Sequence, residues 1–168
     1  IVSGGSWDFK GNDNDPTNTN TDNKDGDHGS SVAGLIASAG WNGKGGRGVA
    51  PSASLRGFNF IRDGVSQTTA QEVNSTGGAS YSSPVHIFNM SIGSSFENSQ
   101  GVVNTTAAAN YLTGFTTLRG NKGAIYVKSA GNEFNSIGDG LDCGNSSYYP
   151  ENDDLITCGS AQFDPTNT

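Results

Sequence analysis

Apolar residues in this chain are grouped into short segments, and long polar stretches separate them. Val32, Leu35 and Ile36 recur at helical spacing, and small residues fill the positions between them, so residues 29–38 are predicted to form a helix. Residues 8–27 consist mostly of Asp, Asn, Gly and Thr without regular apolar spacing, which predicts a loop.

Strands and helices are predicted to alternate along the chain. We expect strands at residues 53–60, 85–90, 124–129 and 155–160, and helices at residues 29–38, 69–73 and 102–118. Short, mostly apolar strands of this kind are typical of parallel sheets that are buried on both faces. The pattern therefore predicts an α/β fold, an open parallel sheet with helices on both faces. The 168 residues correspond to one domain or to the core of one.

Composition narrows the classes of partner. The net charge is −7, and only nine Lys and Arg residues are spread through the chain, so a nucleic-acid partner is not expected. No apolar run approaches the roughly 18 residues that a membrane span needs, so no membrane partner is expected. Ile1, Val2 and Ser3 do not begin a signal peptide, and an export signal is expected upstream.

Two cysteines, Cys143 and Cys158, flank a polar segment before the last predicted strand. A disulfide across this 15-residue separation would contribute about 3 kcal/mol in the chain-entropy model. Such a bond would place the protein in an oxidising compartment. Buried free thiols are the alternative.

Two short segments carry candidate chemistry. His28 lies at the start of the predicted helix of small residues, where it is placed to act as a general base. Asn132 follows Ala130 and Gly131 at the end of a predicted strand, where its amide is placed to donate to an oxyanion. A helix-capping role for His28 and an ordinary Gly-Asn turn are the alternatives. The other histidine, His86, is expected to be a core residue of its strand.

These segments resemble motifs of the subtilisin-like serine endopeptidase family. The resemblance rests on H-G-S-S-V-A-G at 28–34, G-V-A-P at 48–51, N-M-S-I-G at 89–93, A-G-N at 130–132 and L-I-T-C-G-S-A at 155–161. The N-terminal S-W-D-F and N-D-P segments are similar to the kexin-like branch of that family. The resemblance implies a subtilisin-like fold and hydrolysis of peptide bonds by Ser-His-Asp acyl transfer.

The same resemblance implies roles for further residues. His28 would be the general base and Asn132 the oxyanion donor, while Ser91, Ile92 and Gly93, with Ala130 and Gly131, would bind an extended peptide. The family's catalytic aspartate precedes the histidine by more residues than are present here, and no G-T-S-x-A serine motif occurs before residue 168. Residues 1–168 are therefore expected to be the central part of one peptidase domain, inactive alone.

Structural calcium is a further implication of the resemblance. One ion would be held by the side chain of Asn42 and the carbonyl groups of Ala39, Lys44 and Gly46. A second would be held by carboxylates, those of Asp8, Asp13 and Asp15. Solvated loops without bound metal are the alternative at both places.

Three hypotheses for function remain at this point. The first is the central part of a secreted, calcium-stabilised serine endopeptidase that acts on a peptide or protein substrate and that a propeptide or inhibitor binds. A preference for Arg or Lys before the cleaved bond is a weaker expectation. The second is an inactive relative that serves as a calcium-dependent binding or structural module. The third is an unrelated parallel α/β domain.

Overall fold

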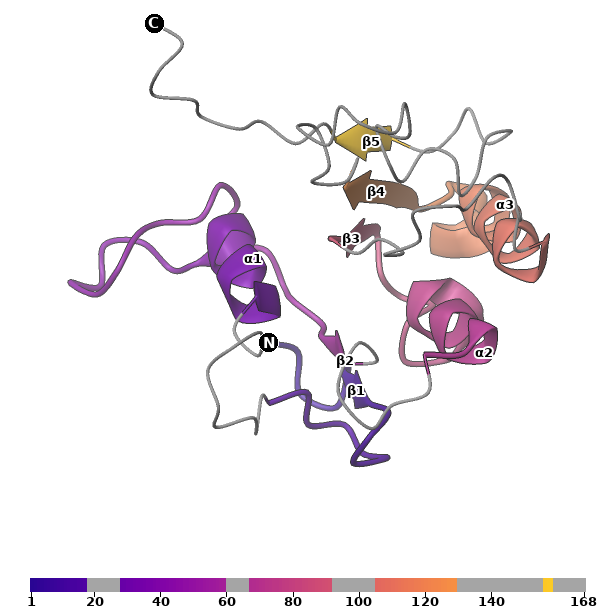
Figure 1. The fold of residues 1–168 in the computed structure, drawn as a ribbon. Coiled ribbons are helices and arrows are strands. Elements are labelled where there is room, and N and C mark those ends of the chain that lie inside the picture. The colour runs from indigo at the N-terminus through magenta and orange to yellow at the C-terminus, as the bar shows by residue number, and fades with distance from the viewer. Residues whose placement is uncertain (18–27, 60–66, 92–104, 130–155, 159–168) are drawn as a thin grey trace, which may run out of the picture. The chain divides into compact units, whose positions relative to one another are not determined.

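A computed structural model describes residues 1–17, 28–59, 67–91, 105–129 and 156–158. The chain divides into two compact units, Ile1–Val85 and His86–Thr168 (Figure 1). Each unit is described by itself. No helix among the described residues is long and apolar enough to cross a membrane.

In the first unit, β1 (Trp7–Asp8) pairs in parallel with β2 (Phe58–Asn59). The ring of Trp7 stacks on that of Tyr81 with centroids 5.0 Å apart. The guanidinium of Arg56 donates to the carbonyl oxygens of Gly5, at 3.3 Å, and Tyr81, at 2.8 Å. These contacts join three segments that are distant in sequence.

The strand predicted at residues 53–60 is shorter than expected. Pro51 lies in a turn in which Ala53 N–H donates to Ala50 carbonyl oxygen at 2.9 Å. Leu55 carbonyl oxygen accepts from Val2 N–H at 2.8 Å, but regular pairing begins only at Phe58. Because Ala53 belongs to this turn, regular strand pairing begins later in the apolar run, and β2 is shorter than predicted.

Helix α1 (His28–Ala37) confirms the helix predicted at residues 29–38. At its C-terminal end, Val49 N–H donates to Leu35 carbonyl oxygen at 3.0 Å, and Ala50 N–H donates to Ile36 carbonyl oxygen at 2.7 Å. The returning chain thus satisfies carbonyls that a helix end leaves unpaired. None of the residues of α1 is buried, and Leu35 is 74% exposed.

Helix α2 (Thr69–Val73) agrees with the predicted helix at residues 69–73. Thr68 caps it: its hydroxyl accepts from Gln71 N–H at 3.3 Å, and Gln71 Oε1 accepts from Thr68 N–H at 2.7 Å. This is a capping box, which satisfies two N–H groups at the helix start. The π-helix η1 (Asn74–Gly78) follows directly.

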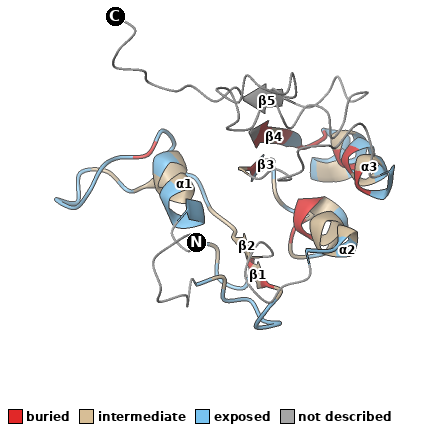
Figure 2. Ribbon diagram, in the orientation of Figure 1, coloured by how far each residue is buried: buried red, intermediate tan, exposed pale blue. Residues whose placement is uncertain are grey.

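In the second unit, β3 (Ile87–Met90), β4 (Ile125–Ser129) and β5 (Ile156–Cys158) form a parallel sheet in that order. Helix α3 (Thr105–Asn121) packs on one face of this sheet. Tyr126 of β4 is fully buried there, stacked on Phe88 and in edge contact with Tyr111 and Phe115 of α3. The buried parts of β4 and α3 are red in Figure 2. The parallel strands confirm the predicted fold class.

The two faces of this sheet differ, although the mostly apolar run at residues 85–90 was predicted to form a buried strand. Phe88 and Met90 are buried, whereas Ile87 is 59% exposed and its partner Ile125 is 41% exposed. The prediction that His86 is a core residue is wrong, because its side chain is exposed. His86 lies before the first paired residue of β3 and contributes only its carbonyl oxygen, which accepts from Ile125 N–H at 3.0 Å.

Candidate functional site

His28 is the first residue of α1, and its side chain is exposed. At the neighbouring Gly29, a Cβ atom would meet nothing within 4 Å, so the backbone beside the imidazole is open. An exposed imidazole at a helix start is accessible for proton transfer to or from a bound group. Asn132, its predicted partner in catalysis, lies outside the described residues.

The sheet edge where β3 and β4 end carries the predicted peptide-binding segments. Met90 pairs with Lys128, so the segments that begin at Ser91 and continue from Ser129 leave the sheet at the same edge. Asn89 Nδ2 donates to Ser91 Oγ at 2.9 Å, which orients the Ser91 hydroxyl. The other predicted members, Ile92, Gly93, Ala130 and Gly131, lie outside the described residues.

A closed loop at residues 38–48 contains the first predicted calcium site. Ser38 carbonyl oxygen accepts from Gly48 N–H at 2.9 Å, and Ser38 Oγ donates to Gly46 carbonyl oxygen at 2.9 Å. Gly48 is required here because a Cβ atom would lie 2.6 Å from Ala37 nitrogen, a separation that side chains do not tolerate. These contacts pin both ends of the loop.

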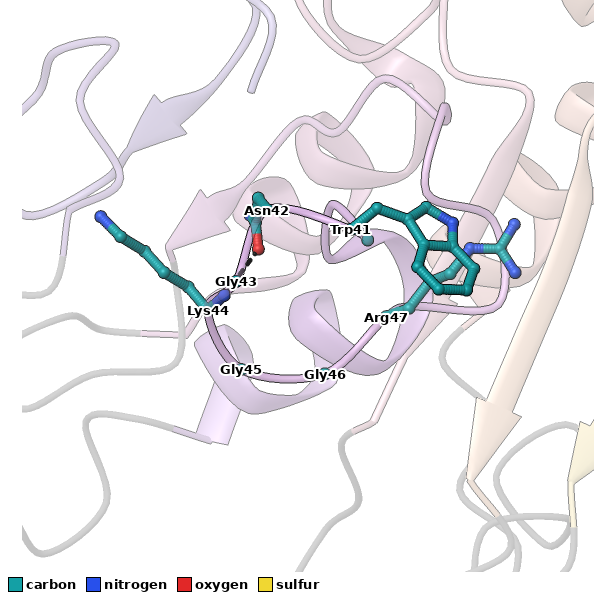
Figure 3. A pocket seen from close by; sticks show the side chains of 8 residues that line it. Trp41, Asn42, Gly43, Lys44, Gly45, Gly46 and Arg47 are labelled. Atoms are coloured by element: carbon teal, nitrogen blue, oxygen red, sulfur yellow. Dashed lines mark hydrogen bonds between the residues drawn. The ribbon is translucent and has the colours of Figure 1, made fainter.

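Within the loop, the side chain of Asn42 folds forward, and its Oδ1 accepts from Lys44 N–H at 3.0 Å (Figure 3). Residues 40–47 line a hollow of about 240 Å³. Asn42 Oδ1 and Gly46 carbonyl oxygen each accept one hydrogen bond, and each oxygen keeps a second lone pair. The donor set of hard oxygens fits a calcium ion chemically.

The predicted acidic site lies at residues 8–15. Asp8 and Asp13 exchange backbone hydrogen bonds of 2.8 and 3.3 Å, and the buried Asp8 carboxylate accepts from Lys10 N–H at 2.8 Å. A Cβ atom at Gly11 would lie 2.7 Å from Asp13 Oδ2 and 3.4 Å from Asp8 Oδ2, so both oxygens approach the same point. Two of the three predicted carboxylates therefore converge.

The third predicted carboxylate, Asp15, is held by Thr17. Its Oδ1 accepts from the hydroxyl and, at 3.0 Å, from the backbone N–H of Thr17, and these two bonds lower the pKa of the Asp15 carboxyl below its usual value. Within residues 1–17, 28–59, 67–91, 105–129 and 156–158, no three His, Cys, Asp or Glu side chains are grouped closely enough to hold a metal ion. Among the described residues, Asp8 and Asp13 therefore form a pair of neighbouring carboxylates, and Asp15 is not part of it.

Cys158 is the last residue of β5 and pairs with Ser129 of β4. Cys143 lies outside the described residues. The Cys143–Cys158 disulfide therefore stays a prediction.

Sequence reasoning missed several residues that shape these sites. Gly11 leaves room for the carboxylates of Asp8 and Asp13, and the signal for it was a glycine placed between two nearby acids. Trp41, which is 95% exposed, and Arg47 line the loop hollow, although nothing in their spacing indicates it. Lys128 is buried at the sheet edge, and a basic residue in an apolar strand was the available signal.

Comparisons with a family model, with curated proteins and with solved structures all identify relatives among serine proteases. The subtilase family model matches residues 3–165. The chain is 35% identical over 127 residues to the Aeromonas extracellular serine protease of Aeromonas sobria, which covers 75% of this chain and 20% of that protein. It therefore spans about a fifth of that relative's length.

Two eukaryotic relatives match over a similar stretch. Furin-like protease 2 of Drosophila melanogaster is 32% identical over 130 residues, 76% of this chain and 7% of that protein. The dibasic-processing endoprotease of Schizosaccharomyces pombe is 30% identical over 129 residues, 76% of this chain and 17% of that protein.

Solved structures agree with these sequence matches. The crystal structure of the Aeromonas sobria serine protease has a TM-score of 0.65 at 31% identity, covering 77% of this chain and 21% of that one. The same protease in complex with a chaperone gives a TM-score of 0.65 at 30% identity, covering 76% and 21%. Because the family model spans nearly all of its residues, this chain belongs to the subtilase family.

Proposed function

We propose that the protein containing this chain is a serine endopeptidase that hydrolyses peptide bonds by acyl transfer. His28 takes the proton of the attacking serine hydroxyl and returns it to the leaving amine. The Asn132 carboxamide donates to the oxyanion that forms at the attacked carbonyl. The catalytic aspartate and serine come from other parts of the same peptidase domain, of which residues 1–168 are a central part, so these residues alone are inactive.

The observation that carries this proposal is the family match across residues 3–165, which contains both motifs in order. The register of β3 and β4 supports it, because Ser91 and the segment that leads to Asn132 leave the sheet at one edge. In open parallel sheets, ligands bind at the carboxyl ends of the strands. A substrate at this edge would meet both segments.

An extended peptide is the substrate class that suits this edge. Ser91, Ile92 and Gly93 would pair with one side of the peptide backbone, and Ala130 and Gly131 with the other. A basic residue before the cleaved bond is favoured by the net charge of −7 and by the similarity to a dibasic-processing endoprotease. The acidic balance of the chain would attract such a substrate electrostatically.

We also propose that the loop at residues 38–48 binds structural calcium. Asn42 Oδ1 and the carbonyl oxygens of Ala39, Lys44 and Gly46 would hold the ion, because hard oxygen ligands suit calcium. The pinned ends of the loop favour binding, because less chain has to be ordered when the ion binds.

A second calcium ion is proposed at Asp8, Asp13 and Asp15. The approach of the Asp8 and Asp13 oxygens to one point supports it, because two carboxylates without a cation between them repel each other. Asp15 is not grouped with this pair among the described residues, so its carboxylate would have to approach Asp8 and Asp13 when the ion binds.

Secretion, a disulfide and a protein partner complete the proposal. The relative from Aeromonas sobria is extracellular, and an extracellular location is compatible with a Cys143–Cys158 bond. That protease has also been crystallised with a chaperone, and this supports the proposal that a propeptide, inhibitor or chaperone binds this protein.

A serine-directed fluorophosphonate tests the activity. The protein at its full natural length should be labelled at one serine, and His28→Ala should abolish the labelling because no general base remains. His86→Ala is the matched control, since that histidine is exposed and lies outside the site, and it should label like the wild type. A folded wild-type protein without label would instead favour the inactive calcium-dependent module.

A further inference from the structure

The loop at residues 38–48 contains a reactive dipeptide that the proposed activity does not use. Asn42–Gly43 is the only Asn-Gly pair among the 168 residues. An asparagine followed by glycine is the sequence most prone to spontaneous deamidation, because no side chain on the second residue hinders attack by its backbone nitrogen. We propose that Asn42 is a site of spontaneous deamidation whose rate depends on whether calcium occupies the loop.

The geometry of the loop favours the first step. Asn42 Oδ1 accepts from Lys44 N–H at 3.0 Å, so the side chain is folded over the intervening peptide that contains the Gly43 nitrogen (Figure 3). Both residues are exposed, and no described residue accepts a hydrogen bond from Gly43 N–H.

The reaction needs only water. The deprotonated Gly43 nitrogen forms a bond to Asn42 Cγ, the Cγ–Nδ2 bond breaks, and ammonia departs. The product is a five-membered succinimide ring. Water then opens the ring at either carbonyl. Opening at Cγ gives aspartate, and opening at the main-chain carbonyl gives isoaspartate, in which the backbone runs through Cγ.

Both products change the proposed calcium site, and this part of the inference rests on that site. Aspartate at position 42 replaces a neutral amide ligand by a carboxylate, which strengthens the attraction for the ion. Isoaspartate adds a methylene group to the backbone between positions 42 and 43. It moves the carbonyl oxygens of Lys44 and Gly46 away from the positions that they have in the loop held by Ser38. Calcium binding therefore weakens.

Bound calcium should slow the first step. An ion held by Asn42 Oδ1 fixes the carboxamide, so only the ion-free loop can close the ring. If calcium is present at 100 times its dissociation constant, the ion-free fraction falls about 100-fold, and the reaction slows by the same factor. The fraction of Asn42 that is deamidated would then increase with the time that the protein has spent without calcium.

The chain supplies an internal control. Asn74–Ser75 is another asparagine followed by a small residue, but it lies in η1, where Ser75 is 3% exposed and the Asn74 N–H is bonded to carbonyls of the preceding turn. A helical backbone keeps the attacking nitrogen away from Cγ. Asn74 should therefore remain intact under conditions that convert Asn42.

The experiment uses the His28→Ala variant at its full natural length, which prevents self-cleavage. Samples are kept at neutral pH in EGTA or in excess calcium, and aspartate and isoaspartate at positions 42 and 74 are followed by peptide mass spectrometry and isoaspartyl methyltransferase labelling. We expect conversion at 42 over days in EGTA, about 100-fold slower conversion at 100 times the dissociation constant, and none at 74. Asn42→Gln should remove the signal, because the longer side chain would have to close a six-membered ring.

Two results would overturn the inference. One is an intact Asn42 in EGTA over a period in which a synthetic peptide of residues 38–48 deamidates, and the other is equal conversion at positions 42 and 74. Equal rates in calcium and EGTA are resolved by calorimetric titration of the same sample. Calcium binding that Asn42→Gln removes, without protection of Asn42, overturns the calcium dependence. If Asn42→Gln binds as much calcium as the sample, the proposed loop site is wrong and only the deamidation site stands.

Discussion

Gly114 of α3 faces the ring of Tyr126, and replacing it with alanine should strain the core of the second unit. A Cβ atom at position 114 would overlap the Tyr126 hydroxyl and lie 2.8 Å from its Cζ. Tyr126 has no room to move away, because Phe88 stacks on its ring at 4.9 Å and Tyr111 contacts its edge at 5.0 Å. Gly114→Ala therefore forces either the helix or the ring out of place.

The expected loss follows from two opposing effects. Overpacking a well-filled core costs about 1–3 kcal/mol, and each disturbed aromatic contact costs about 0.5–1.5 kcal/mol more. Alanine in place of a helical glycine offsets about 1 kcal/mol of this. We therefore expect Gly114→Ala to lower the free energy of unfolding by roughly 2 kcal/mol.

Urea unfolding of the intact protein, followed by near-ultraviolet circular dichroism of the tyrosines, measures this loss. Thr113→Ala is the matched control, because Thr113 is the exposed neighbour in the same helix and should change stability by less than about 0.5 kcal/mol. Tyr126→Phe removes the overlapped oxygen, so the double variant should recover about 1 kcal/mol relative to the sum of the single changes. A Gly114→Ala protein as stable as the wild type, or a double variant without recovery, would refute the packing described here.

Three further predictions concern the cap, the buried tyrosine and the metal. Thr68→Ala should lower the free energy of unfolding by about 1 kcal/mol, because it removes the oxygen that accepts from Gln71 N–H, and urea unfolding measures this. Burial raises the pKa of Tyr126 from 10.0 to about 12, so the folded state holds its proton longer than the unfolded state. The contribution of Tyr126 to stability should therefore be constant below pH 10 and be lost as the pH rises toward 12, and Tyr126→Phe should remove that part of the fall. Calcium bound at the loop of residues 38–48 should stabilise the protein by about 2.7 kcal/mol at 100 times its dissociation constant there, and Asn42→Ala should remove that part of the calcium response in a thermal melt. An equal calcium response in Asn42→Ala would contradict the assigned loop.

The sequence predicted helices and strands well where their formation depends on the spacing of neighbouring apolar residues. The spacing of Val32, Leu35 and Ile36 defines one side of a helix, and α1 begins and ends within one residue of the prediction. Tyr126 and Val127 lie in an apolar run of strand length, and β4 lies where it was expected. Elements of this kind depend mainly on residues close in sequence.

Features that depend on distant residues were predicted less well. His86 is exposed because pairing between β3 and β4 begins only at Ile87, and the residues around His86 do not determine that register. Likewise, the room that Gly11 leaves for two carboxylates appears only when the loop is folded. The candidate site was predicted from motifs, since a general base and an oxyanion donor need particular residue types. That β3 and β4 end at the same edge of their sheet could be seen only from their register.

The most direct test of the account is the turnover of a peptide substrate by an Asn132→Ala variant of the protein at its full natural length. If the Asn132 carboxamide stabilises the oxyanion, kcat should fall by about 10²–10³ while KM changes little. That magnitude is the one established for an asparagine donor in a subtilisin, and we carry it over from there. A variant that folds like the wild type and turns over the peptide with an unchanged kcat would contradict the proposed catalytic role of this chain.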